Sequence, residues 1–232
     1  LLFWKLNIGI KNMIIIASVI SAFALIPLIF VKDPKTKPIK NSMFKGVSLL
    51  SGKLKYFIFV SGIFALAHFS LFMFMILWAE KITGSKVIAI ALFALFNLIY
   101  AIFAIPFGSF SDRVGRKKVL LIGYGLLAVV CFGFVFLSSI YGLIFLFGVY
   151  GLVYALVQPN QSALVSDLSG KMKGTALGTY YFATGILSIF GGWIAGVIWD
   201  ISKTGMFFYL AIIAFLSFIL LIFVNEKDGY RK

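Results

Sequence analysis

The chain has 232 residues, of which 62% are apolar and only 12% are charged, and its mean hydropathy is +1.09. Soluble domains carry about 45–50% apolar and about 25% charged residues, so this composition excludes an ordinary soluble protein and indicates a chain embedded in the lipid bilayer. The net charge of +14 does not indicate a nucleic-acid partner, because the basic residues lie in short gaps between long apolar runs.

The chain opens with LLFWKLNIGIKNM, which has no initiator methionine, no basic leader segment and no cleavage site. This beginning is typical of the middle of a longer protein, and we expect the chain to be a fragment. Cys131 lies within an apolar run and is the only cysteine, so no disulfide within the chain is predicted.

Seven uncharged runs are each long enough to cross a membrane as a helix, which needs about 20 mostly apolar residues. They cover residues 13–31, 56–79, 87–110, 119–140, 141–166, 174–199 and 206–224. The runs lack the alternation of a barrel strand, and backbone groups in lipid must be paired internally. The sequence therefore predicts an all-α membrane protein with seven transmembrane helices.

Basic residues mark one side of this membrane protein. Sixteen of the 21 Lys and Arg residues lie in residues 32–55, 111–118, 167–173 and 225–232, which share a side if successive runs alternate in direction. Since positive loops stay inside, we expect that side, with the C-terminus, to be cytoplasmic in a multi-pass protein of the cell (plasma) membrane.

The longest gap, residues 32–55, contains seven lysines and two prolines and is predicted to be a basic cytoplasmic linker between two groups of helices. Its lysines fit either a solvated tether beside an anionic membrane surface or a regulatory contact. Within it, the segment SMFKGVSLLSGKLK, residues 42–55, can form a short interfacial helix.

The segment GSFSDRVGRKK, residues 108–118, concentrates charge after the third run. Gly108 lets another helix approach closely, and Gly115 permits a sharp turn. The Asp112 carboxylate can accept hydrogen bonds from the start of a neighbouring helix, while an arginine here can bind a carboxylate with two hydrogen bonds. A loop that only sets topology would need the bases but neither the acid nor the two glycines.

These residues resemble the signature G-x-x-x-D-R-x-G-R-R/K of the major facilitator superfamily, which joins its second and third helices and recurs between the eighth and ninth. The matching positions are Gly108, Asp112, Arg113, Gly115, Arg116, Lys117 and Lys118. Residues 164–185 resemble the family's junction between helices 10 and 11. The resemblance covers essentially the whole chain and aligns its seven runs with helices 6 to 12.

The resemblance implies a domain organisation. Residues 1–31 would hold the last helix of the N-terminal bundle with the external loop before it, residues 32–55 the linker, and residues 56–232 the C-terminal six-helix bundle. In the family the signature loop is a cytoplasmic latch between two halves that rock in alternating access. Asp112 is then expected to face a helix of the N-terminal half, which is missing from this chain.

Within this half, the resemblance predicts that Arg113 or Arg116 pairs with Asp167, and Lys117 belongs to the same latch. The alternative is that Asp167 only caps the short turn before Lys171.

The family lines its cavity with helices that correspond to the second and fifth runs. The candidate cavity residues there are His68, Phe72, Tyr150, Tyr154, Gln158 and Gln161. Those of the fifth run recur at helical spacing on one face, and polar groups at this depth turn away from lipid. An unperturbed histidine titrates near neutral pH, so His68 fits a substrate or proton role. For all these polar groups, hydrogen bonds between helices are the alternative interpretation.

Three further features border the other half in the family or face lipid. Asn97 and Tyr100 in the third run are a second polar pair, and Gly192 and Gly196 in the sixth run permit close helix packing, either with the missing half or within the bundle. The fourth and seventh runs are expected to face lipid.

The function predicted from these patterns is secondary active transport of a small-molecule substrate. The uncharged aromatic cavity favours efflux of drug-like or hydrophobic compounds; uptake of a sugar or metabolite, or a truncated non-transporting membrane component, is the alternative. Coupling to protons or sodium would use an acid of the missing half, because no charge lies deep in any run. No enzymatic activity, catalytic residue, metal site or cofactor is predicted, and no nucleotide-binding signature is present in the sequence.

Overall fold

The computed structural model describes residues 10–23 and 43–224, and the chain divides into two units, residues 1–41 and 42–232. In the first unit the structure describes helix α2, Ile10–Phe23. The span predicted over 13–31 therefore lies partly outside the described residues. The first part of the linker and the tail 225–232 lie entirely outside them.

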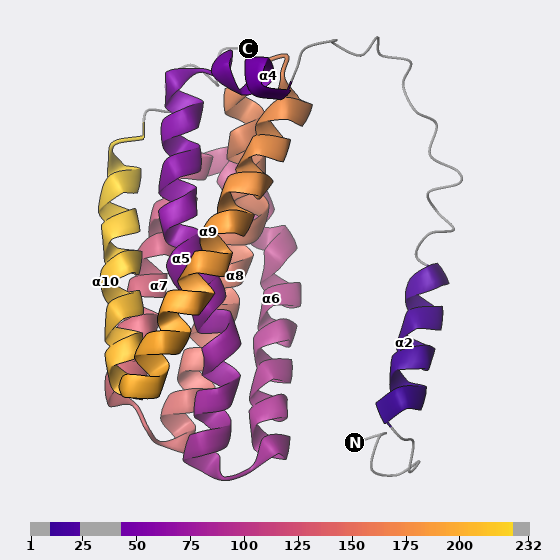
Figure 1. Cartoon of the computed structure of the whole chain (residues 1–232), viewed down its shortest axis with the longest axis vertical. Helices are drawn as coiled ribbons and strands as arrows, with labels where there is room; N and C mark the ends of the chain where they lie inside the picture. The colour runs from indigo at the N-terminus through magenta and orange to yellow at the C-terminus, as the bar shows by residue number, and fades with distance from the viewer. Residues whose placement is uncertain (1–9, 24–42, 225–232) are drawn as a thin grey trace. The chain divides into compact units, whose positions relative to one another are not determined.

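The second unit is a bundle of six long helices, preceded by a short one (Figure 1). These are α4 (Met43–Ser48), α5 (Gly52–Thr83), α6 (Lys86–Val114), α7 (Arg116–Phe136), α8 (Ile140–Leu168), α9 (Lys173–Ile201) and α10 (Lys203–Ile222). All six long helices are apolar and long enough to cross a membrane. The all-α membrane class is confirmed, and each of the last six predicted runs coincides with one helix.

Serine caps begin four of these helices and keep the connections short. Ser51, Ser85, Ser139 and Ser202 each accept a hydrogen bond on the side-chain oxygen from a backbone N–H three residues later, at 3.0–3.4 Å. Such a cap satisfies an N–H group that the helix itself leaves unpaired. The cap at Ser139 also explains why α7 ends at Phe136, before the predicted end of its run at residue 140, since the chain must already turn there.

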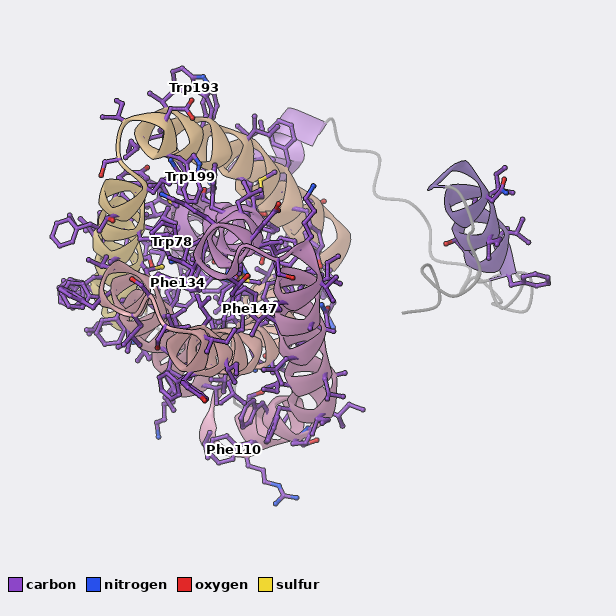
Figure 2. All side chains as sticks on the ribbon, turned by 90° about the horizontal axis from the view of Figure 1, so that it is seen from below. Trp78, Phe110, Phe134, Phe147, Trp193 and Trp199 are labelled. Carbon is purple, nitrogen blue, oxygen red and sulfur yellow. The ribbon has the colours of Figure 1, made fainter. Side chains whose placement is uncertain are left out.

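The helices pack mainly in pairs, α6 with α8, α7 with α10 and α5 with α9, while α7 and α8 join the pairs. Glycines allow the closest approaches. A Cβ built on Gly191 of α9 would lie 2.6 Å from the carbonyl oxygen of Leu66 in α5, and one on Gly151 of α8 would lie 2.8 Å from that of Phe96 in α6. Large buried rings such as Phe134 and Phe147 fill the interior (Figure 2).

Short α4 lies at the end of the bundle where α5 begins (Figure 1). Gly46 packs against Thr175 near the start of α9, and the Lys55 ammonium donates to the Ser48 carbonyl at 2.7 Å. The segment predicted to form an interfacial helix is thus helical at 43–48 and again from Gly52. The loop between α6 and α7 lies at this same end, which we call the loop end.

Candidate functional site

The loop that carries the signature consists of one residue, Gly115, between α6 and α7. Its φ of 99° and ψ of 132° are uncommon for residues with a side chain, and its N–H donates to the Ser111 carbonyl at 3.0 Å. Because this glycine turns the chain sharply, Asp112 in the last turn of α6 and Arg116 at the first position of α7 come within contact of each other. A Cβ on Gly108 would meet no other atom of the described residues within 4 Å.

Arg116 joins three helices through two carboxylates. Its guanidinium lies 3.0 Å from Asp112 in α6 through Nη2 and 2.6 Å from Asp167, near the end of α8, through Nε. The arginine side chain is only 20% exposed, so neighbouring helices shield it from bulk water more than they shield either acid. Of the two arginines predicted as partners for Asp167, Arg116 makes the contact, while Arg113 is exposed.

Two further contacts tie this loop to the bundle. The Lys117 ammonium donates to the Ile222 carbonyl at 2.7 Å, so a base of the signature pairs with the C-terminal end of α10, where free carbonyls favour a cation. The hydroxyl of buried Ser111 contacts both the Gly108 carbonyl and the Asn160 side chain in α8. Neither contact could be predicted from the spacing of residues in the sequence, since each depends on how the helices pack.

The six predicted cavity residues divide into two groups. His68, Tyr150 and Gln161 are at most 4% exposed and lie inside the bundle. Phe72 and Tyr154 are half-buried, and Gln158 is exposed. Helix α8 continues through Pro159 without a break, so the proline does not end the helix between these groups.

Gln161 connects three helices inside the bundle. Its amide nitrogen donates to the Tyr124 hydroxyl in α7 at 2.6 Å, and its amide oxygen accepts from the Tyr180 hydroxyl in α9 at 2.8 Å. All three side chains are buried. This network uses Gln161 to hold helices together, which is the role that interhelical hydrogen bonds have in membranes.

Tyr154 is the centre of an aromatic cluster at the middle of the helices. Its ring lies 4.6 Å from that of His68, 5.9 Å from Phe72, 5.2 Å from Phe96 and 5.4 Å from Tyr100. Its hydroxyl makes no hydrogen bond within the described part of the chain. Tyr154, Tyr100 and His68 each lie at the midpoint of their helix.

An apolar groove of about 910 Å³ adjoins this cluster between α5 and α9. Its lining consists mostly of large apolar side chains: Phe69, Phe72, Met73, Phe74, Ile76, Leu77, Ile189 and Trp193, with Ser188 and Gly192. Phe72 belongs to both the groove and the aromatic cluster. Trp193 points outward from α9 at the edge of the bundle (Figure 2).

Comparison with known proteins gives one family. A profile described as the Major Facilitator Superfamily matches residues 57–232. The chain belongs to the Major Facilitator Superfamily. It is also 44% identical over 228 residues to the uncharacterized MFS-type transporter MJ1317 of Methanocaldococcus jannaschii, an alignment that covers 94% of this chain and 57% of that relative. The chain thus spans little more than half the length of this curated relative.

Two helices of this Major Facilitator Superfamily bundle are less covered than the others. In α6 and in α9 only 17% of the residues in the apolar stretch of the helix are buried, against 39–56% in the other four long helices. The open faces carry features that lipid alone does not favour. Asn97 is exposed near the middle of α6, and a Cβ built on Gly178 or Gly185 of α9 would meet no atom of the described residues within 4 Å. The chain is therefore part of a multi-pass membrane protein, and the family to which it belongs is a family of transporters.

Proposed function

We propose that this chain is the C-terminal part of a secondary transporter of the plasma membrane that exports small lipophilic molecules by alternating access. One observation carries the proposal: Asn97 and Gln158 are exposed near the middle of their helices. A polar amide in contact with acyl chains is costly, so polar groups at this depth face protein or an aqueous cavity. The open faces of α6 and α9 are then the surfaces that meet the N-terminal half.

The opposite pair of helices supports this orientation of the bundle. A groove of about 390 Å³ between α7 and α10 is lined by apolar side chains, among them Val129, Phe132 and Phe215. A surface without hydrogen-bonding side chains suits acyl chains. We infer that α7 and α10 face lipid, as expected for the fourth and seventh runs, and that the loop end is cytoplasmic because the basic residues concentrate there.

The aromatic cluster and the groove give the substrate class. The wall that they form presents rings from Phe72, Tyr100 and Tyr154, and the central parts of the six long helices carry no Asp, Glu, Lys or Arg in the described residues. Such a wall suits an apolar or weakly polar molecule, and its rings also attract a delocalised cation. Uptake of a sugar or metabolite is the competing function, and it would require more hydrogen-bonding groups than this wall offers.

The charged contacts of Arg116 supply a mechanism for the cytoplasmic side. By bridging Asp112 and Asp167, the arginine holds the ends of α6, α7 and α8 together, so that they move as one body when the two halves rock. Gly108 and the exposed side of Asp112 remain available to a helix of the other half. Coupling to a proton or sodium gradient is assigned to a carboxylate of that half.

The test is a charge swap in the complete gene product, assayed by transport of a lipophilic cationic dye in membrane vesicles. Export releases the dye from right-side-out vesicles and accumulates it in inverted vesicles. Arg116→Asp and Asp167→Arg should each abolish most export, and the double variant should regain it, because it restores an ion pair between α7 and α8. Lys171→Asp, a charge reversal at an exposed lysine outside the signature, is the matched control and should retain export. A double variant as inactive as the single variants would refute the latch. Uptake of dye into right-side-out vesicles would refute the assigned direction, and uptake of a sugar would refute the assigned substrate.

A further inference from the structure

His68 is the only histidine of the chain and is 2% exposed at the middle of α5. The Tyr150 hydroxyl donates to the His68 backbone carbonyl at 2.8 Å, and the same oxygen lies 3.4 Å from the imidazole Nδ1. Because the single hydroxyl hydrogen is used on the carbonyl, the tautomer that fits this contact carries its hydrogen on Nδ1. In that tautomer Nε2 carries a lone pair, and Nε2 has no hydrogen-bond partner within the described residues.

The imidazole is covered by aromatic rings and not by polar groups. Phe64 and Tyr154 lie roughly parallel to it, at 5.0 and 4.6 Å between ring centroids, and Phe69 meets it edge-on at 5.6 Å. Phe69 also lines the groove between α5 and α9, as does Phe72 beside Tyr154. His68 therefore lies one layer of side chains behind the groove.

Of the two rings that lie roughly parallel to the imidazole, Tyr154 is the less enclosed. Phe64 is buried, whereas Tyr154 is half-buried and its hydroxyl makes no hydrogen bond to the described residues. Rotation about its two side-chain bonds would take the Tyr154 ring off the imidazole. A buried acceptor without a partner is uncommon in folded proteins, because leaving it unpaired costs free energy that a ligand donor would recover.

We propose that Nε2 of His68 is a concealed hydrogen-bond acceptor of the substrate site, uncovered when the Tyr154 ring swings aside. It selects lipophilic molecules that carry an N–H or O–H donor over equally lipophilic molecules without one. The inference rests on the proposed export of lipophilic molecules. No charged side chain lies at this depth in the described residues, so the donor is either a neutral hydroxyl or amine or a delocalised cation held by the surrounding rings.

The covering role of Tyr154 can be measured without any ligand. Diethyl pyrocarbonate modifies unprotonated imidazole, and peptide mass spectrometry of the purified complete gene product reports modification at His68 alone. We expect Tyr154→Ala to react several-fold faster than the wild-type protein, and Tyr154→Phe, which keeps the ring, to react like the wild type. Thermal unfolding verifies that each variant is folded. Equal rates in all three proteins would overturn the covering role.

The ligand class is tested in the wild-type protein, so it does not depend on a variant that folds. The probes are a rhodamine methyl ester with free amino groups and its tetramethylated counterpart, which lacks N–H donors. The first should slow modification of His68 about two- to tenfold more than the second, the range expected for one net hydrogen bond. Equal slowing by both probes, or no slowing by either, would overturn the assignment and leave His68 as a packed residue or the partner of a buried water.

Transport of the same two probes in vesicles separates the two proposals. Export of either probe without protection of His68 refutes the inference and leaves the proposed function intact. Protection of His68 by the amino probe without export of either probe retains the binding site and refutes the proposed function. As a further control, His68→Gln keeps an acceptor and should keep the preference for the amino probe, whereas His68→Leu should lose it.

Discussion

Replacing Gly191 by alanine should force α5 and α9 apart. The added Cβ would lie 2.6 Å from the Leu66 carbonyl oxygen and 2.7 Å from its Cα, whereas ordinary contacts begin at 3.4 Å, so the shortfall is about 0.8 Å. The obstacle is backbone and not a flexible side chain, which means that a rotamer change cannot relieve it. Overpacking of this kind costs about 1–3 kcal/mol, and the rigid obstacle places Gly191→Ala at the upper part of that range.

The assay is thermal unfolding of the complete gene product in detergent, followed by tryptophan fluorescence. Gly174→Ala is the matched control, because Gly174 lies on the same helix and a Cβ there meets nothing within 4 Å among the described residues. Gly191→Ala should lower the midpoint clearly, and Gly174→Ala should leave it nearly unchanged. If the two variants unfold at the same temperature, the close approach of α5 and α9 at Leu66 is wrong.

Two other substitutions test the network and the loop. Gln161→Leu leaves the buried hydroxyls of Tyr124 and Tyr180 without this partner and should lower the free energy of unfolding by about 1–3 kcal/mol for each. Denaturation in mixed micelles measures this loss. A loss no larger than that caused by Gln158→Leu, at an exposed position, would contradict the network. Gly115→Ala should lower the free energy of unfolding by about 1–3 kcal/mol, because a φ of 99° strains a residue that has a side chain. Amide exchange at the start of α7 should become faster. Exchange as slow as in the wild type would show that the turn tolerates a side chain.

Much of the fold could be predicted because lipid imposes simple rules on a sequence. Charged residues are excluded from the bilayer core and backbone groups must pair internally, so uncharged runs of membrane length mark helices. The last six runs, the all-α class and the family followed from these rules and from the spacing of Gly108, Asp112 and Gly115. The exception was the end of α7, where a local serine cap at Ser139 moved a boundary that hydropathy alone could not place.

The site was less predictable, for a physical reason. In a soluble helix the polar face marks the exterior, but in these helices both the lipid-facing and the buried side are apolar, so hydropathy does not tell them apart. Spacing alone could place Tyr150, Tyr154 and Gln158 on one side of a helix, yet neighbouring helices bury the first, half-cover the second and leave the third exposed.

The sequence by itself determined the number of described long helices, their approximate limits and the residues that form the charged turn. Only the tertiary structure decided which arginine contacts Asp167, that Gln161 joins three helices and that His68 lies covered beside a groove. The first set depends on local composition and on the solvent of each segment. The second depends on contacts between residues far apart in the chain, which are fixed by close packing at sites such as Gly151 and Gly191.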